Sequence, residues 1–217
     1  MRAKITDLQI VEEILQGQKD AFEILIRRYN QRLYRIIRIY IRDEDEIEDL
    51  IQETYLSCYE NLAGFNRRAA FSTWLTRIAI NKALLHLRER KKKLSILDSL
   101  KELFSDMEKN DNSVNPEEKM ISQETKIQLE KLVDRLPDKY REVFMMSQIV
   151  QMKSVDIASF LDISEENVRV RLLRAKRILK DRLEPALAQN ALFEFGNERC
   201  DLLTFQVMEM ISRVTSF

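Results

Sequence analysis

The apolar positions of this chain recur every three or four residues, which is the spacing of helices that bury one face. One apolar stripe crosses residues 22–40, and a second crosses residues 47–58. A third stripe follows Gly64 and consists of Phe71, Trp74, Leu75 and Ile78. Repeated strand-like alternation is absent from the sequence. These patterns predict three or four helices packed into one bundle.

The helical spacing fades in residues 95–126, where the chain is polar, acidic and interrupted by Pro116. Such a composition is typical of a flexible linker. Apolar spacing returns in residues 127–185, and a short extension follows in residues 186–217. We therefore predict an all-α fold, in which two small helical domains, residues 1–94 and 127–185, are joined by a flexible acidic linker and followed by a C-terminal extension.

A helix-turn-helix pattern lies inside the second domain. Residues 154–163 read as a short helix and a tight turn, and Ser164 is a good N-cap for the helix that follows. The turn has Asp162 where glycine is common, and aspartate adopts the left-handed conformation less freely. The second helix is apolar on one side and basic elsewhere, which is typical of a helix that enters the major groove of DNA. The alternative is a packing element whose exposed face is basic without a DNA target.

Composition supports a helical fold and argues against several classes of protein. The 217 residues include only three glycines and three prolines, and 33% are charged, which favours a nearly all-helical chain. No apolar run approaches about 18 residues and the N-terminus lacks a signal-peptide core, so we expect a cytoplasmic protein. Two distant cysteines, Cys58 and Cys200, and one histidine, His86, are too few for a zinc site. We expect free thiols, no metal and no other cofactor.

Formal net charge is zero, yet the charges are segregated along the chain. Residues 43–60 hold eight acids and no lysine or arginine, whereas residues 67–93 hold nine bases and one acid. Basic segments attract phosphates, and aromatic side chains among them can stack on unpaired bases at about 1–3 kcal/mol per base. This combination indicates single-stranded nucleic acid as a ligand. Trp74 by itself is either a stacking platform or a core residue, and the usual burial of tryptophan favours the core.

The order of these parts resembles the extracytoplasmic-function (ECF) sigma factors, the small two-domain promoter-recognition subunits of bacterial RNA polymerase. The first domain resembles region two of that family in residues 20–29 (DAFEILIRRY), 48–62 (EDLIQETYLSCYENL) and 71–81 (FSTWLTRIAIN). The second domain resembles region four in residues 136–144 (LPDKYREVF) and 167–179 (NVRVRLLRAKRIL). The acidic linker is similar to the segment that threads the polymerase active-centre and RNA-exit channels.

The resemblance implies a protein that binds core RNA polymerase, directs it to specific promoters and promotes melting, without catalytic activity of its own. It implies that the clamp helices of the largest polymerase subunit bind Asp49, Gln52 and Glu53. It implies that the single-stranded minus-ten element, with one flipped base, is bound by Phe65, Arg67, Arg68, Trp74, Arg77, Asn81, Lys82 and Arg88. It implies that the double-stranded minus-thirty-five element is contacted by Arg169, Val170, Arg171, Arg174 and Arg177. The polymerase flap and an anti-sigma factor are the further partners that it suggests.

Other interpretations remain open. A stand-alone helix-turn-helix repressor or activator would use the first domain for sensing or dimerisation, and it would predict a palindromic operator. An enzyme is not expected, because the chain has no glycine-rich phosphate loop and His86 has no evident acid partner. The extension in residues 186–217 has an apolar helical face, so it is either a cap folded onto region four or a docking site for a regulator.

Overall fold

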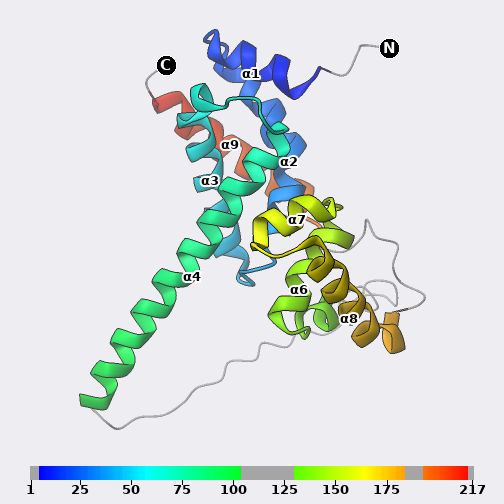
Figure 1. Cartoon of the computed structure of the whole chain (residues 1–217). Helices are drawn as coiled ribbons and strands as arrows, with labels where there is room; N and C mark the ends of the chain where they lie inside the picture. The colour runs from blue at the N-terminus through cyan, green and yellow to red at the C-terminus, as the bar shows by residue number, and fades with distance from the viewer. Residues whose placement is uncertain (1–4, 104–129, 184–192, 215–217) are drawn as a thin grey trace.

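The computed structural model of the chain describes residues 5–103, 130–183 and 193–214 (Figure 1). Within these residues the regular elements are α-helices, short 3-10 helices and one π-helical turn. The predicted all-α fold is therefore confirmed, with one helical domain on each side of the linker. Residues 104–126 of the predicted linker lie outside the described residues.

The first domain contains α1 (Asp7–Leu15), α2 (Phe22–Ile37), α3 (Glu44–Glu60) and α4 (Phe71–Leu103). Helix α2 packs against α1, α3 and α4, so it occupies the centre of this bundle. The predicted apolar stripes form its core, including the fully buried Leu25, Ile51 and Leu75. The buried hydroxyl of Tyr55 donates a 3.0 Å hydrogen bond to the Ile26 carbonyl, which offsets the cost of burying a polar group.

Local signals explain where α1 and α3 begin. Thr6 and Gln9 form a reciprocal capping box at the start of α1. Asp43 caps α3 by accepting hydrogen bonds from the backbone N–H groups of Asp45 and Glu46. Three acidic residues in the first turn of α3 also interact favourably with the positive end of the helix dipole.

Helix α4 differs from the sequence-based expectation, because it continues to Leu103 instead of ending where the linker was predicted to begin. Residues 95–103 are thus helical. Their sequence, SILDSLKEL, lacks glycine and proline and places leucine or isoleucine at helical spacing, so nothing in it terminates the helix. In Figure 1, α4 projects well beyond the rest of its bundle.

The second domain comprises α6 (Asp138–Phe144), the π-helical turn η3 (Met145–Ile149), α7 (Ser154–Leu161) and α8 (Glu165–Leu183). Helix α8 packs on α6 and α7 through the buried Val168, Ala175 and Leu179. This domain also rests on α2. Arg38 forms a two-point contact with Asp134, at 3.1 and 2.6 Å, and Arg32 donates to the Val150 carbonyl at 3.2 Å.

The final helix, α9 (Asn197–Arg213), lies against α2 and α3 of the first domain. Its buried residues are Leu203, Thr204, Val207 and Ile211. The predicted apolar face of the extension therefore exists, but it is buried against region two and not as a cap on region four. Residues 186–192 lie outside the described residues.

Candidate nucleic-acid interface

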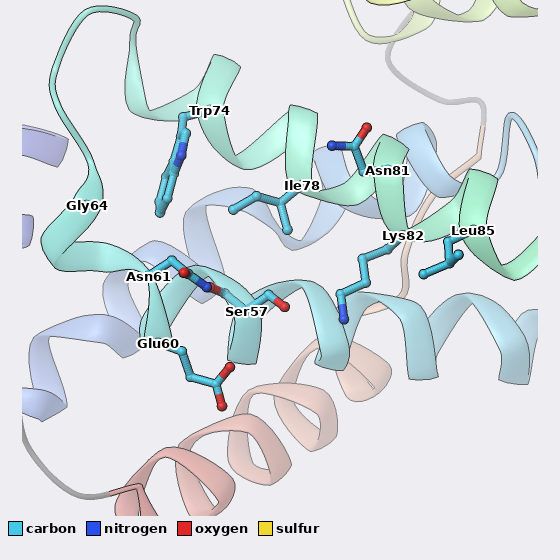
Figure 2. A pocket seen from close by; sticks show the side chains of 9 residues that line it. All are labelled: Ser57, Glu60, Asn61, Gly64, Trp74, Ile78, Asn81, Lys82 and Leu85. Atoms are coloured by element: carbon cyan, nitrogen blue, oxygen red, sulfur yellow. The ribbon is translucent and has the colours of Figure 1, made fainter.

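A pocket of about 660 Å³ opens between the C-terminal half of α3 and the first half of α4 (Figure 2). Its volume falls in the range of about 300–1,000 Å³ that small-ligand sites occupy. Helix α4 contributes Trp74, Ile78, Asn81, Lys82 and Leu85. Helix α3 and the turn after it contribute Ser57, Glu60, Asn61 and Gly64. One wall is thus largely apolar, with an amide and an ammonium group at its end.

Aromatic rings hold Trp74 in place at the pocket. The Trp74 ring centroid lies 5.1 Å from that of Phe65 and 5.8 Å from that of Phe71. Phe65 and Phe71 are buried, whereas Trp74 is only half-buried and lines the pocket. The two interpretations of Trp74 are therefore compatible, since one side of it packs on the core and another part remains accessible. Phe65, which the family resemblance places among the DNA contacts, lies in the core, where it packs against Trp74.

The polar groups of the pocket differ in how strongly the protein already engages them. The Asn61 amide donates a 2.8 Å hydrogen bond to the Ser57 carbonyl. The Lys82 ammonium lies 3.3 Å from the Glu53 carboxylate. The Asn81 side chain is exposed and belongs to the pocket lining, and its amide points away from α3 in Figure 2. An amide there can both donate to and accept from the edge of a base.

The other basic residues of this region surround the pocket at greater distance and do not line it. Arg68 and Arg88 are exposed. Arg67 is exposed as well and forms a 2.9 Å ion pair with Glu12 of α1. Arg77 lies against the second domain, where it donates to the Ser159 hydroxyl at 3.4 Å and sits 5.4 Å from the Phe160 ring centroid. An exposed ion pair such as Arg67–Glu12 contributes about 0–1 kcal/mol to stability, so a phosphate can replace the carboxylate.

The three residues expected to bind core polymerase share one side of α3 but have different surroundings. Asp49 is exposed. Glu53 is exposed and reaches towards Lys82 of α4. Gln52 is half-buried and donates a 2.8 Å hydrogen bond to Gln206 of α9. Their spacing brings the three together as expected, while α9 occupies one edge of the surface that they form.

In the second domain, the helix-turn-helix geometry follows from two residues. Asp162 ends α7 in the left-handed conformation, with φ 52° and ψ 48°, although glycine adopts this conformation at lower cost. Ser164 then caps α8, because its hydroxyl accepts a 3.1 Å hydrogen bond from the Asn167 N–H. A left-handed turn residue followed by a cap sets the angle between α7 and α8.

Helix α8 presents its basic residues to solvent. Val170 is 41% exposed, and Arg169, Arg174 and Arg177 are exposed as well. Arg171 is half-buried and donates a 3.0 Å hydrogen bond to Asn167 one turn earlier. Arg174 donates to the Tyr140 hydroxyl at 3.5 Å, and this hydrogen bond lowers the pKa of that tyrosine. The predicted contacts thus share one accessible surface.

Sequence patterns did not identify the residues that α3 contributes to the pocket. Ser57 and the C-cap residue Asn61 follow Glu53 at intervals of four positions, so they continue one stripe of α3. This four-residue spacing marks one face of α3 in the sequence, but it does not show that α4 lies beside that face.

The described residues contain no cluster of three or more metal-ligating side chains, and none of their helices is long and apolar enough to cross a bilayer. Cys58 is buried, Cys200 is half-buried, and both are free thiols. Burial raises the pKa of the Cys58 thiol. A helical bundle with an open pocket, together with a basic helix-turn-helix domain, is the arrangement of a DNA-binding protein.

Comparison with known proteins gives the family. Residues 25–93 match the model of sigma-70 region 2, and residues 126–179 match that of sigma-70 region 4. The ECF RNA polymerase sigma-E factor of Haemophilus influenzae is 28% identical over 193 residues, which cover 86% of this chain and all of that protein. RNA polymerase sigma-H factor of Pseudomonas aeruginosa is 29% identical over 187 residues, 84% of this chain and 96% of that one.

Two solved structures share the fold. CnrH, solved in complex with the cytosolic domain of CnrY, superposes with a TM-score of 0.53 at 21% identity, covering 79% of this chain and 93% of CnrH. Sigma factor RpoE, solved with the anti-sigma factor NepR from Bartonella quintana, also gives 0.53, at 18% identity, covering 73% and 91%. The chain belongs to the ECF sigma factor family and directs RNA polymerase to promoters. Members of this family are not enzymes, so the chemistry of transcription belongs to the polymerase.

Proposed function

We propose that this sigma factor promotes promoter melting by capturing one unpaired base of the minus-ten element in the pocket between α3 and α4. The observation that carries the proposal is the pocket itself, which combines the Trp74 ring, the Asn81 amide and the Lys82 ammonium. A base has a flat face for stacking and a polar edge for hydrogen bonds. Both become available only after the base leaves the duplex.

The energetics of capture are consistent with this arrangement. Extruding a base costs a few kcal/mol. Stacking on an aromatic ring returns about 1–3 kcal/mol, and a net hydrogen bond to Asn81 adds about 0.5–1.5 kcal/mol. Phosphate contacts by Lys82, Arg88 and the arginines of the preceding loop supply a further salt-dependent contribution. Several weak terms together thus offset the cost of flipping.

Region four is the proposed reader of the minus-thirty-five element. Its helix α8 carries the exposed Arg169 and Arg174 and the half-buried Arg171, and Val170 and Arg177 are exposed as well. A bidentate arginine contact with guanine supplies about 1–3 kcal/mol of discrimination, while other basic residues hold phosphates. The two domains would then bind the same promoter at separate elements, in keeping with proposed boundaries of 1–94 and 127–185.

Core polymerase is the proposed partner of Asp49, Gln52 and Glu53, through its clamp helices, and region four would meet the flap. We place the protein in the cytoplasm, where polymerase and promoters are found. An anti-sigma factor is a further proposed partner, because RpoE of Bartonella quintana was solved with one. Co-purification from cells that carry a tagged full-length protein tests for such an inhibitor.

The polymerase face is tested by the double variant Asp49→Ala/Glu53→Ala. Both side chains are exposed, so the fold should tolerate their loss. We expect the Kd for core polymerase to rise about 5- to 30-fold, the effect of losing about 1–2 kcal/mol of interface energy. The control is Glu165→Ala/Glu166→Ala, which removes the same charge from region four. Unchanged assembly of the first variant would refute the assignment.

The promoter function is tested by mapping transcript starts genome-wide, with purified core polymerase in the presence and absence of this protein. Starts that depend on the protein should share two sequence elements, one upstream and one at the melted segment. A single palindromic site, protected by the protein alone, would instead favour the repressor.

A further inference from the structure

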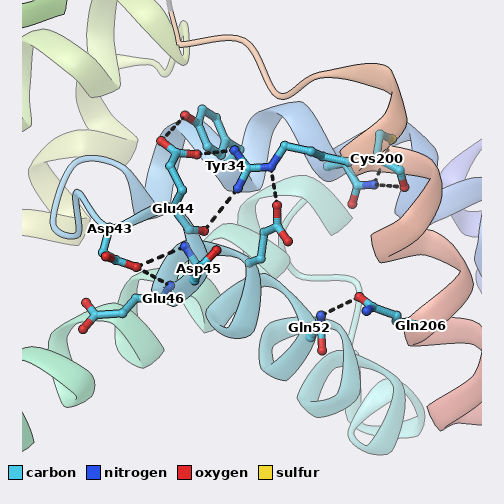
Figure 3. A network of polar contacts seen from close by, with 11 residues as sticks. Tyr34, Asp43, Glu44, Asp45, Glu46, Gln52, Cys200 and Gln206 are labelled. Atoms are coloured by element: carbon cyan, nitrogen blue, oxygen red, sulfur yellow. Dashed lines mark hydrogen bonds and ion pairs between the residues drawn. The ribbon is translucent and has the colours of Figure 1, made fainter. Parts of the chain in front are cut away.

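Helix α9 is held on region two by an apolar face and by a row of polar contacts (Figure 3). Leu203, Val207 and Ile211 are buried, with 1% or less of each side chain exposed. Arg27 of α2 forms a 2.5 Å ion pair with Asp201, and Lys19 donates to the Val214 carbonyl at 2.6 Å. Contacts along the whole helix define one specific position for α9.

The contacts with α3 follow a single stripe of that helix. Arg199 lies between the carboxylates of Glu44 and Glu48, with 2.7 Å to the Glu44 oxygen. Two turns beyond Glu44, Gln52 donates to Gln206 at 2.8 Å (Figure 3). Residues 44, 48 and 52 repeat every four positions, so they lie on one face of the helix. Helix α9 therefore runs along α3 and covers this face.

The covered stripe adjoins the surface proposed for core polymerase. Asp49 and Glu53 each follow a covered residue by one position, which corresponds to a rotation of about 100° around the helix. Gln52 belongs to both surfaces, and its amide is already bound by Gln206. A polymerase helix placed across Asp49, Gln52 and Glu53 would meet the side of α9 that carries Gln206.

We propose that α9 is a built-in competitor of core polymerase, which must leave α3 before the clamp helices can bind there. The inference rests on the proposed polymerase face and adds regulation to it. Electrostatics support a reversible contact, because Arg199 neutralises two acids of the acidic α3 while its own side chain is 38% exposed. A basic side chain of a partner can take the place of Arg199 beside these two carboxylates.

A charge reversal tests the competition. Arg199→Glu places a third carboxylate beside Glu44 and Glu48, so it should release α9 from α3. We expect the affinity of the full-length variant for core polymerase to rise at least about threefold, with the gain larger at low salt. The control is Arg213→Glu, which makes the same change at an exposed residue that pairs only with Glu209 of its own helix in the described residues. Equal affinities of Arg199→Glu, Arg213→Glu and unmodified protein would overturn the inference.

Hydrogen exchange of the unmodified protein provides a test that needs no variant. Amides of residues 197–213 should exchange faster when core polymerase is bound, while those of residues 48–53 should exchange more slowly. Exchange in residues 197–213 that stays the same or slows overturns the competition, even where residues 48–53 become protected. Unchanged exchange in residues 48–53 refutes the polymerase face, and with it this inference. The two failures are thus read from different peptides.

Discussion

The pocket between α3 and α4 is concave and combines apolar side chains with two amides, one carboxylate and one ammonium group, whereas α8 presents exposed arginines to solvent. A concave apolar site suits the face of a single unpaired base. An exposed basic helix suits the groove of an intact duplex, whose bases are accessible only at their edges. On the proposed function, one protein binds two states of the same DNA, paired upstream and melted downstream.

The contrast extends to what each surface contacts in the absence of DNA. Arg174 is hydrogen-bonded to Tyr140, and Arg171 to Asn167 of the same helix, so the partners of these two arginines are uncharged. In region two, Lys82 pairs with Glu53, and Arg77 contacts the second domain. If region two binds DNA as proposed, Lys82 and Arg77 exchange these partners for phosphates, and that exchange would couple melting to the arrangement of the domains.

The largest effect is expected at α8, for Arg174→Ala. Loss of a bidentate contact should cost about 1–3 kcal/mol, or about 5- to 150-fold in affinity, at one upstream base pair only. Binding to a panel of promoter duplexes with single base changes measures it. The control Lys92→Ala, which removes an exposed charge of α4, should weaken all sequences alike and reduce the salt slope by about one. If both variants lose affinity equally on every duplex, α8 binds phosphates without recognising the base sequence.

A smaller effect is expected in the pocket, for Asn81→Ala. This variant should still recruit polymerase and bind duplex DNA through α8, yet initiate about 2- to 12-fold less, the effect of about 0.5–1.5 kcal/mol. A template with a pre-melted bubble removes the unpairing cost and should restore much of the activity. The matched variant Asn61→Ala should have little effect, because that amide is bound to the Ser57 carbonyl. Equal defects on duplex and bubble templates would contradict base capture by Asn81.

Sequence patterns predicted those features that local spacing controls. The buried stripes of α2 and α3, the Ser164 cap and the basic surface of α8 all follow from residues a few positions apart. The extension of α4 to Leu103 differs from the predicted linker, because the polar composition of this segment is typical of a linker although its residues also favour a helix.

Long-range contacts could not be predicted in the same way. An apolar stripe shows that a helix has a buried face, but not which partner covers it. Hence the extension was expected on region four or on a regulator, whereas α9 packs on α2 and α3. For the same reason Phe65 was grouped with the DNA contacts, although its ring is buried beside Trp74 and Phe71. Ser57 and Asn61 line the pocket because α3 packs against α4, and no local sequence pattern predicts that pairing.

Permanganate footprinting of promoter DNA tests the central claim most directly, because it detects unpaired thymines. Duplex promoters found by transcript mapping would be treated with core polymerase, with and without the full-length protein. We expect reactive thymines at the minus-ten element only when both proteins are present, and weaker reactivity with Asn81→Ala. If no promoter opens, while the protein alone protects a palindromic duplex, promoter melting by this chain is contradicted.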